Sequence, residues 1–337
     1  MQSPAVSEWS TSRTRGGTVV TVLGIDIGKA DFHCALLSAD GTVRAQSFPN
    51  SRAGFVRLAK WLVNRKTTRV HACLEATGGW SEELAFYLHE RAHVVSIVNP
   101  LVIKAFGQSL LSRTKTDKAD AELIARYCAA MKPEAWKPPS PVQRRLQQLV
   151  RRRVALSDML VQEQNRLESP GADEIANSIE RTIAFLQDQI AEIDEEIRSL
   201  IDDDPTLRQR RDLLESIPGI GERTSATILG EIPNIAEFRS GKAVAAFAGL
   251  CPRIRRSGTS VAASWLSKVG NRAVRRALYL PAISAMRWNP LLASWAKELR
   301  ARGKRPKQII AAVMRRLLVL AYGVLRSGKA FDVAYRA

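Results

Sequence analysis

The stretch TVVTVLGID at residues 18–26 decides the fold of the first half of the chain. It is a continuous apolar, β-branched run, which is typical of a buried strand. The alternating run DFHCALLS follows Gly28, and a third run at 42–48 follows the turn at Asp40 and Gly41. These three runs predict a three-stranded antiparallel meander at the start of the folded chain.

Helical and strand-like patterns alternate beyond the meander. The expected elements are a helix through Phe55, Leu58, Trp61 and Leu62, a strand at 70–74, a helix near 82–90, a strand at 94–98 and a helix at 117–131. Strands that alternate with helices after a meander predict a mixed sheet covered by helices. We therefore expect an α/β domain over residues 18–137. Residues 1–17, rich in Ser, Thr and Arg, are expected to be a disordered lead-in.

The pattern changes to long helices over residues 138–205. Two series of apolar residues at steps of three and four, broken by Ser169-Pro170-Gly171, predict a helical hairpin or coiled coil that connects two domains. Heptad spacing does not reveal whether the partner helix lies in the same chain or in a second copy. One face of the second series is acidic, which argues against nucleic acid on that face. Its acidic residues are Asp188, Glu192, Asp194, Glu195 and Glu196.

Residues 206–330 are expected to form an all-α domain. The stretch LLESIPGIGERTSATILGEI at 213–232 resembles a helix-hairpin-helix element, with a glycine-rich turn between two short helices. In such an element the backbone N–H groups near Gly219 and Gly221 face a phosphate. A purely structural helical corner is the alternative. The later helices are separated by a basic loop at 253–267 and a basic turn at 300–307.

Positive charge is concentrated in the last quarter of the chain. The 337 residues carry 51 Lys and Arg against 33 Asp and Glu, a net charge of +18, and the residues from 251 onward hold 19 basic and 2 acidic residues. This imbalance favours a polyanionic partner such as nucleic acid. The candidate contact residues are Lys115, Arg253, Arg255, Arg256, Lys268, Arg272, Arg275, Arg276, Lys304 and Arg305. Trp265, Tyr279, Trp288 and Trp295 lie among them, as stacking partners or as ordinary core residues.

Composition argues against several other classes of protein. With 45% hydrophobic and 25% charged residues, the chain is expected to be globular. The four cysteines are too far apart for a zinc ribbon, and the histidines lack a metal-ligand spacing. The first residues lack the apolar core of a signal peptide, and the late apolar stretch at 309–325 is interrupted by Arg315 and Arg316. We therefore expect a cytoplasmic protein without a membrane span.

Acidic residues stand where strands end and a helix begins. Asp26 ends the first strand in GIDIG, and Glu75 ends a later buried strand in LEATGG. Asp117 and Asp120 lie three apart at a helix start, so both face one side, although helix-dipole stabilisation alone would also favour them there. If these elements converge, four carboxylates hold one or two Mg²⁺ ions for phosphoryl transfer.

The motif around Asp26 is ambiguous by itself. GIDIGK resembles the first strand of ribonuclease H-like nucleases and also the phosphate loop of actin and sugar-kinase ATPases. An ATPase of that kind needs a second loop rich in Asp and Gly in a later domain, and we find none in the sequence. It also has no need of the basic last quarter. A binding protein without catalytic activity is a further alternative, disfavoured by the four acidic residues.

The motifs taken together resemble one family. GIDIGK, LEATGG, VNP at 98–100 and RTKTDKADA in the first half, and SIPGIGERTSATILGEI, FAGLCPRIRRSG and SKVGNRAVRRALY in the second, occur in the order found in transposases of the insertion-sequence "one-ten" family. These are the Piv/MooV relatives with a RuvC-like DEDD domain and a C-terminal serine transposase domain. The resemblance extends from about residue 20 to about residue 325.

The resemblance implies a function and a set of site residues. It implies a ribonuclease H-like (RuvC-like) first domain in which Asp26, Glu75, Asp117 and Asp120 ligate Mg²⁺, and it matches Ser257 to a serine that attacks DNA and forms a phosphoserine link. Ser260, Ser264 and Ser267 lie in the same loop. It also implies donor and target DNA as substrates, a structured guide RNA from the flanks of the element, and a homo-oligomer in a prokaryotic cytoplasm. The alternative is a metal-dependent nuclease of the Holliday-junction type, which uses water as the nucleophile.

Overall fold

The computed structural model describes residues 21–76, 78–110, 116–169, 173–257 and 260–333. The chain forms two compact units, Met1–Pro138 and Pro139–Ala337. The predicted lead-in at 1–17 lies outside the described residues.

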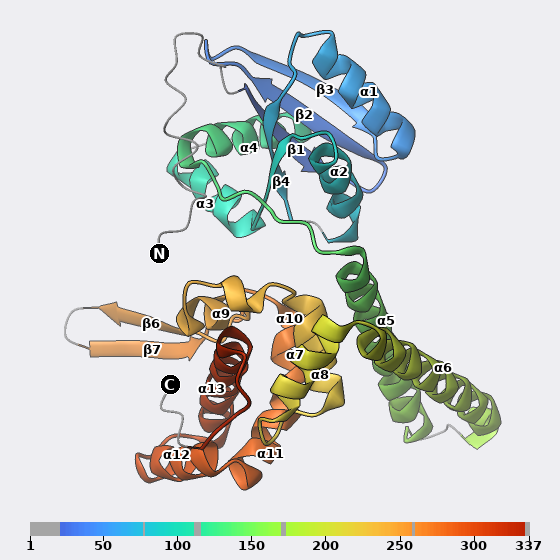
Figure 1. The fold of residues 1–337 in the computed structure, drawn as a ribbon, viewed down its shortest axis with the longest axis vertical. Coiled ribbons are helices and arrows are strands. Elements are labelled where there is room, and N and C mark those ends of the chain that lie inside the picture. The colour runs from blue at the N-terminus through green and yellow to red at the C-terminus, as the bar shows by residue number, and fades with distance from the viewer. Residues whose placement is uncertain (1–20, 77, 111–115, 170–172, 258–259, 334–337) are drawn as a thin grey trace. The chain divides into compact units, whose positions relative to one another are not determined.

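The first unit is built on a mixed five-stranded sheet with the order β3-β2-β1-β4-β5 (Figure 1). Its strands are β1 (Thr21–Ile27), β2 (Asp31–Leu37), β3 (Val43–Pro49), β4 (Val70–Glu75) and β5 (Val94–Val98). β1 pairs antiparallel with β2 and β2 antiparallel with β3, whereas β1–β4 and β4–β5 are parallel. The predicted meander and mixed sheet are therefore confirmed.

Helices cover both faces of this sheet. The four helices are α1 (Arg52–Val63), α2 (Gly79–His89), α3 (Pro100–Ser109) and α4 (Asp117–Met131). Phe55 and Leu58 of α1 pack with Leu84 of α2 against one face. Ile103 of α3 and Ile124 of α4 pack against the other face. The sequence analysis missed α3, although the N-cap Asn99 and the following Pro100 mark its start.

The second unit begins with two long helices, α5 (Pro141–Leu167) and α6 (Ala176–Asp203), which lie side by side (Figure 1). Leu156 of α5 packs with Leu186 and Ile190 of α6. Charged residues flank this contact, with ion pairs Arg145–Glu196 at 2.9 Å and Arg153–Asp194. The two apolar series predicted from sequence thus meet within one chain, and part of the acidic face is paired with α5.

The rest of the second unit packs onto one end of this helix pair. It contains α7 (Pro205–Glu215), α8 (Glu222–Glu231), α9 (Gly241–Phe247), α10 (Arg272–Ala277), α11 (Tyr279–Trp288), α12 (Pro290–Ala301) and α13 (Pro306–Ser327), with a short 3₁₀ turn at Ile235–Glu237. Another 3₁₀ turn, Asp173–Ile175, lies between α5 and α6. Leu146 and Ile197 of the long helices share one core with Ile228 and Leu317. The predicted connector is therefore partly embedded in the core of the second unit.

A β-hairpin replaces the loop expected at 253–267. Strands β6 (Pro252–Ser257) and β7 (Ser260–Leu266) pair antiparallel, with a register shift between Arg255 and Arg256. The expectation of an all-helical second half was wrong at this point. The cations of β6, PRIRRS, and the small residues of β7, SVAASWL, leave no clear alternation of apolar and polar residues.

One helix among the described residues, α13, is long and apolar enough to cross a membrane by length and composition alone. Half of its most apolar window is buried, and its side chains Val313, Leu317 and Leu320 belong to the core of the second unit. The position of these side chains explains its apolar character by packing.

Candidate active site

The four predicted acidic residues lie at one edge of the first sheet. Asp26 is the penultimate residue of β1 and Glu75 is the last residue of β4, and both are partly buried. β1 and β4 are parallel neighbours with Ile25 opposite Leu74. Asp26 and Glu75 are the next residues on the two strands, so their carboxylates lie side by side at the same end of the strands. Asp117 and Asp120 form the first turn of α4, which covers the same face.

A close approach between β1 and α4 brings the helix start to Asp26. A Cβ added at Gly24 would lie 2.2 Å from the carbonyl oxygen of Ala121 and 2.3 Å from the nitrogen of Ala125. Side chains two residues apart in a strand share a face, so Asp26 points to the face on which α4 lies. Thr116 caps α4 by accepting a hydrogen bond from the Ala119 N–H at 3.2 Å, which fixes where the helix starts. Glycine at position 24 is therefore part of the construction of the site.

The carboxylates repel one another. Burial raises the pKa of Asp26, and the negative charges of Asp120 and Asp117 raise it further. Burial also raises the pKa of Glu75, with added repulsion from Asp26 and Asp120. Like charges held together in partial burial disfavour the ionised forms, and a cation bound among them would relieve that cost.

His33 is a member of this cluster that the sequence analysis did not identify. It lies on β2 directly opposite Asp26, so its side chain occupies the same face of the sheet. Its Nδ1 is 3.9 Å from Oδ2 of Asp117, and it opposes the rise in the pKa of Asp26. A single histidine in an alternating strand gives no signal in sequence, whereas the antiparallel register places it beside two carboxylates.

The donor set fits Mg²⁺ in its chemistry. Carboxylate oxygens are the protein ligands that this ion prefers. Within the described parts of the chain no group of three or more His, Cys, Asp or Glu side chains is close enough to hold a metal ion in the present arrangement. The four residues thus gather at one edge without forming a complete coordination shell.

The predicted nucleophile lies in the second unit. Ser257 is the last residue of β6, opposite Ser260 of β7. The side chains of residues 254–264, which include Arg255 and Arg256, lie outside the described part of the structure, as does Lys115. The backbone therefore places Ser257 near the tip of a basic hairpin.

The predicted nucleic-acid contacts differ in their surroundings. Lys268, Arg272, Lys304 and Arg305 are exposed. Arg276 forms an ion pair with Asp158 of α5, and Arg275 donates hydrogen bonds to the carbonyl oxygens of Ala248 at 2.9 Å and Gly270 at 3.1 Å. Both of these side chains therefore have a structural partner within the second unit.

The aromatic residues near these positions also divide into two groups. Trp265 and Tyr279 are nearly half exposed and Trp288 is 65% exposed. The guanidinium groups of Arg253 and Arg287 lie over the rings of Trp265 and Trp288, respectively. Trp295 instead packs against the core, as an ordinary interior residue would.

The turn that resembles a helix-hairpin-helix element links α7 to α8. Gly219 has a positive φ of 106°, and a Cβ there would lie 2.7 Å from that of Ala285 on α11, so close packing explains this glycine. Gly221 is the exposed N-cap of α8, and a Cβ added there would meet nothing within 4 Å. Of the two glycines, Gly221 thus has the surroundings that a phosphate contact needs.

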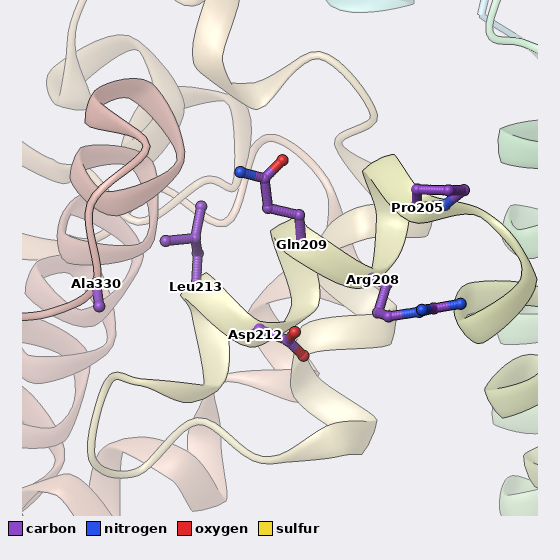
Figure 2. A pocket seen from close by; sticks show the side chains of 6 residues that line it. All are labelled: Pro205, Arg208, Gln209, Asp212, Leu213 and Ala330. Atoms are coloured by element: carbon purple, nitrogen blue, oxygen red, sulfur yellow. The ribbon is translucent and has the colours of Figure 1, made fainter.

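An open hollow beside α7 offers no comparable chemistry. Figure 2 shows side chains of α7 around it, together with Ala330. Its two charged residues already have partners, because Arg208 donates to the carbonyl oxygen of Asp202 and Asp212 pairs with Arg211 at 3.0 Å. The lining residues are Pro205, Arg208, Gln209, Asp212, Leu213 and Ala330. The cluster of Asp26, Glu75, Asp117 and Asp120 in the first unit is the stronger candidate site.

Comparisons with known proteins match both halves of the chain to transposase families. A family model described as a transposase, of the IS110 DEDD type, matches residues 23–170, and one described as the IS116/IS110/IS902 transposase family matches residues 211–296. The chain is 38% identical over 317 residues to the pilin gene-inverting protein of Moraxella bovis, covering 93% of this chain and 98% of that protein.

Two further similarities are more distant. The chain is 24% identical over 289 residues to the transposase for insertion sequence element IS1328 of Yersinia enterocolitica, covering 77% of this chain and 82% of that protein. Among solved structures, it is similar to Thermus thermophilus RuvC at 15% identity and a TM-score of 0.26, covering 34% of this chain and 99% of that one.

Proposed function

The chain belongs to the IS110 family of transposases, and from that premise we propose that it is a recombinase that cuts and rejoins the donor and target DNA of an insertion sequence. The observation that carries this proposal is the meeting of Asp26, Glu75, Asp117 and Asp120 at one edge of a mixed sheet. The raised pKa values of Asp26 and Glu75 are typical of carboxylates that share a bound cation. We assign the first unit to the ribonuclease H-like, RuvC-like class on the same grounds.

The four carboxylates are the proposed Mg²⁺ ligands. When bound, Mg²⁺ supplies a Lewis acid that polarises the scissile phosphate and stabilises charge on the departing oxygen. Asp26 and Glu75 are held by the sheet, and Asp117 and Asp120 by the first turn of α4. Rigid elements of this kind keep ligand oxygens in place during the reaction.

Ser257 is the proposed nucleophile. In the cutting step its Oγ forms a bond to phosphorus while the bond from phosphorus to the leaving strand's oxygen breaks, and the serine proton passes to that oxygen. Rejoining is the reverse step with the hydroxyl of a different strand, so no external energy source is needed. The support for Ser257 is its match to the family motif and its place on a hairpin that carries Arg253, Arg255 and Arg256, since cations nearby favour the alkoxide.

The partners follow from charge and from the family. A net charge of +18 and exposed cations such as Lys304 and Arg305 support contact with DNA, and also with a structured guide RNA encoded by the element. Exposed Met159, Val161 and Phe185 on the long helices support a homo-oligomer formed through that pair. We place the enzyme in the prokaryotic cytoplasm, where its DNA substrates lie.

Covalent capture tests this proposal. The full chain, co-expressed with the flanking sequences of its element, is mixed with labelled donor and target DNA and Mg²⁺, denatured, and resolved for protein-linked DNA. We expect an adduct in the wild type and none in Ser257→Ala or Asp26→Asn, while Ser260→Ala retains it. Nicked DNA without an adduct, unchanged by Ser257→Ala, would assign the protein instead to the water-dependent nucleases.

A further inference from the structure

A row of polar residues continues from the carboxylates across the first sheet. In the strand register Asp26 of β1 lies opposite His33 of β2, and His33 lies opposite Ser47 of β3. Opposed residues share a face, so all three side chains occupy the face on which α4 lies. The row therefore runs from the catalytic edge toward β3, the edge strand of the sheet.

An open hollow lies over the far end of this row. Residues of β2, β3 and the first turn of α4 line it, namely His33, Cys34, Ala45, Gln46, Ser47 and Lys118. Ser47 and Lys118 are exposed, and His33 is partly exposed. Among the described residues neither the Ser47 hydroxyl nor the Lys118 ammonium has a hydrogen-bond or ion-pair partner. Two donors thus face a hollow that opens to solvent.

The chemistry of the row changes along its length. At the carboxylate end, Glu75 and Asp26 present only hydrogen-bond acceptors when ionised. At the other end, His33 donates through a ring N–H and Ser47 through its hydroxyl, and Lys118 of α4 adds the donors of its ammonium group. A phosphodiester group offers only acceptors and one negative charge, so the donor end suits it. Asp117 directly precedes Lys118 in α4, and its Oδ2 lies 3.9 Å from Nδ1 of His33, one of the residues that line the hollow.

We propose that the hollow bounded by His33, Ser47 and Lys118 is a binding subsite for a backbone phosphate of the same DNA strand that reaches the carboxylates. This inference rests on the proposed function and deepens it. Two strand spacings separate β1 from β3, which is about 10 Å, so one strand of DNA spans both positions. The subsite holds that strand in line across the sheet and carries no base specificity, because its donors recognise only the backbone.

Cysteine footprinting of the full chain with its co-expressed flanking RNA and donor DNA tests the subsite directly. Cys34, Cys73 and Cys128 are buried, so a Cys251→Ser background leaves little reactive thiol. Ser47→Cys is placed in the hollow. Lys60→Cys serves as the matched control, since Lys60 is exposed on α1, which covers the opposite face.

We expect donor DNA at about ten times its Kd to slow alkylation of Ser47→Cys about tenfold and to leave Lys60→Cys unchanged. In the otherwise native chain, Lys118→Gln is expected to lower the slope of log K against log salt concentration by about one, and Lys60→Gln to leave it unchanged. The RNA-bound chain without DNA shows whether the hollow already holds RNA, because Ser47→Cys would then be protected before DNA is added.

The outcomes separate the two proposals. If wild type forms the covalent adduct while Ser47→Cys stays fully reactive in the DNA complex and Lys118→Gln behaves like Lys60→Gln, the subsite is wrong and the recombinase proposal stands. Protection by RNA alone also overturns the subsite as a DNA site. If wild type forms no adduct with any donor DNA, the proposed function itself fails.

Discussion

Replacement of Gly24 by alanine tests how the site is built. The added methyl group would lie 2.2 Å from the Ala121 carbonyl oxygen, 2.3 Å from the Ala125 nitrogen and 2.8 Å from the Ala125 Cα. Ordinary contact begins near 3.4 Å, so β1 and α4 must separate by about 1.2 Å, the difference between 3.4 and 2.2 Å. All three obstructing atoms belong to the backbone, and a rotamer change cannot relieve them.

Two consequences of this separation can be measured. Overpacking of this kind costs about 1–3 kcal/mol, and three backbone contacts favour the upper end of that range. A displacement of about 1 Å between catalytic groups reduces rate about 100-fold, and α4 carries Asp117 and Asp120. We therefore expect Gly24→Ala to fold with reduced stability and to form the covalent adduct about 100-fold more slowly.

Hydrogen exchange at the amides of β1 reports the stability change, and the rate of adduct formation reports the activity. Gly79→Ala is the matched control, because a Cβ at Gly79 meets nothing within 4 Å. Unchanged exchange protection and unchanged rate in Gly24→Ala would refute the argument that close packing of α4 on β1 positions the carboxylates.

Three further predictions concern stability. Glu231 is nearly buried and accepts hydrogen bonds from Arg151 at 2.8 Å and Asn271 at 2.7 Å. We therefore expect Glu231→Ala to lower the free energy of unfolding of the second unit by about 1–3 kcal/mol in urea titration. The control Arg145→Ala breaks an exposed ion pair and should cost at most about 1 kcal/mol, so equal losses in the two variants would contradict a structural role for Glu231. Leu146→Ala, at a fully buried position where the long helices join the core of the second unit, should cost about 2–5 kcal/mol by the same titration, and a loss below 1 kcal/mol would show that this junction is loosely packed. Burial lowers the pKa of His93 below about 6.5, and its Nδ1 accepts a hydrogen bond from the Val70 N–H. As the pH falls below about 6.5, the unfolded chain therefore protonates this imidazole before the folded chain does, and the free energy of unfolding decreases. His93→Asn should flatten this dependence of the unfolding free energy on pH, and an unaltered dependence would assign it to other groups.

Much of the first unit could be predicted from sequence because its signals are local. Alternation at 31–38 and the turn at Asp40 and Gly41 indicated a hairpin, and the strand at 70–75 ends at the glycine-rich LEATGG stretch. The helix predicted at 117–131 has these bounds in the structure, since Thr116 is a strong N-cap. In contrast α3 was missed, although Asn99 and Pro100 are a helix-start signal that separates it from β5.

The second unit showed where such signals fail. The β6–β7 hairpin was expected to be a loop, since the cations of β6 and the small residues of β7 leave no clear period of two. Heptad spacing in α5 and α6 predicted long helices and left their partner undecided, and the contact of Leu156 with Leu186 and Ile190 answered that question within one chain. The partner of a helix depends on the path of the connecting chain, which periodicity does not encode.

The sequence by itself determined the family, the element types of the first unit and the four acidic positions, because motif order and strand or helix periodicity are properties of the chain alone. Tertiary structure decided that Gly24 lets α4 approach β1, that His33 joins the carboxylates, and that Ser47 and Lys118 share a hollow beside them. These relations depend on strand register and on how closely a helix packs onto a sheet. Such distances join residues far apart in the chain, so no local pattern records them.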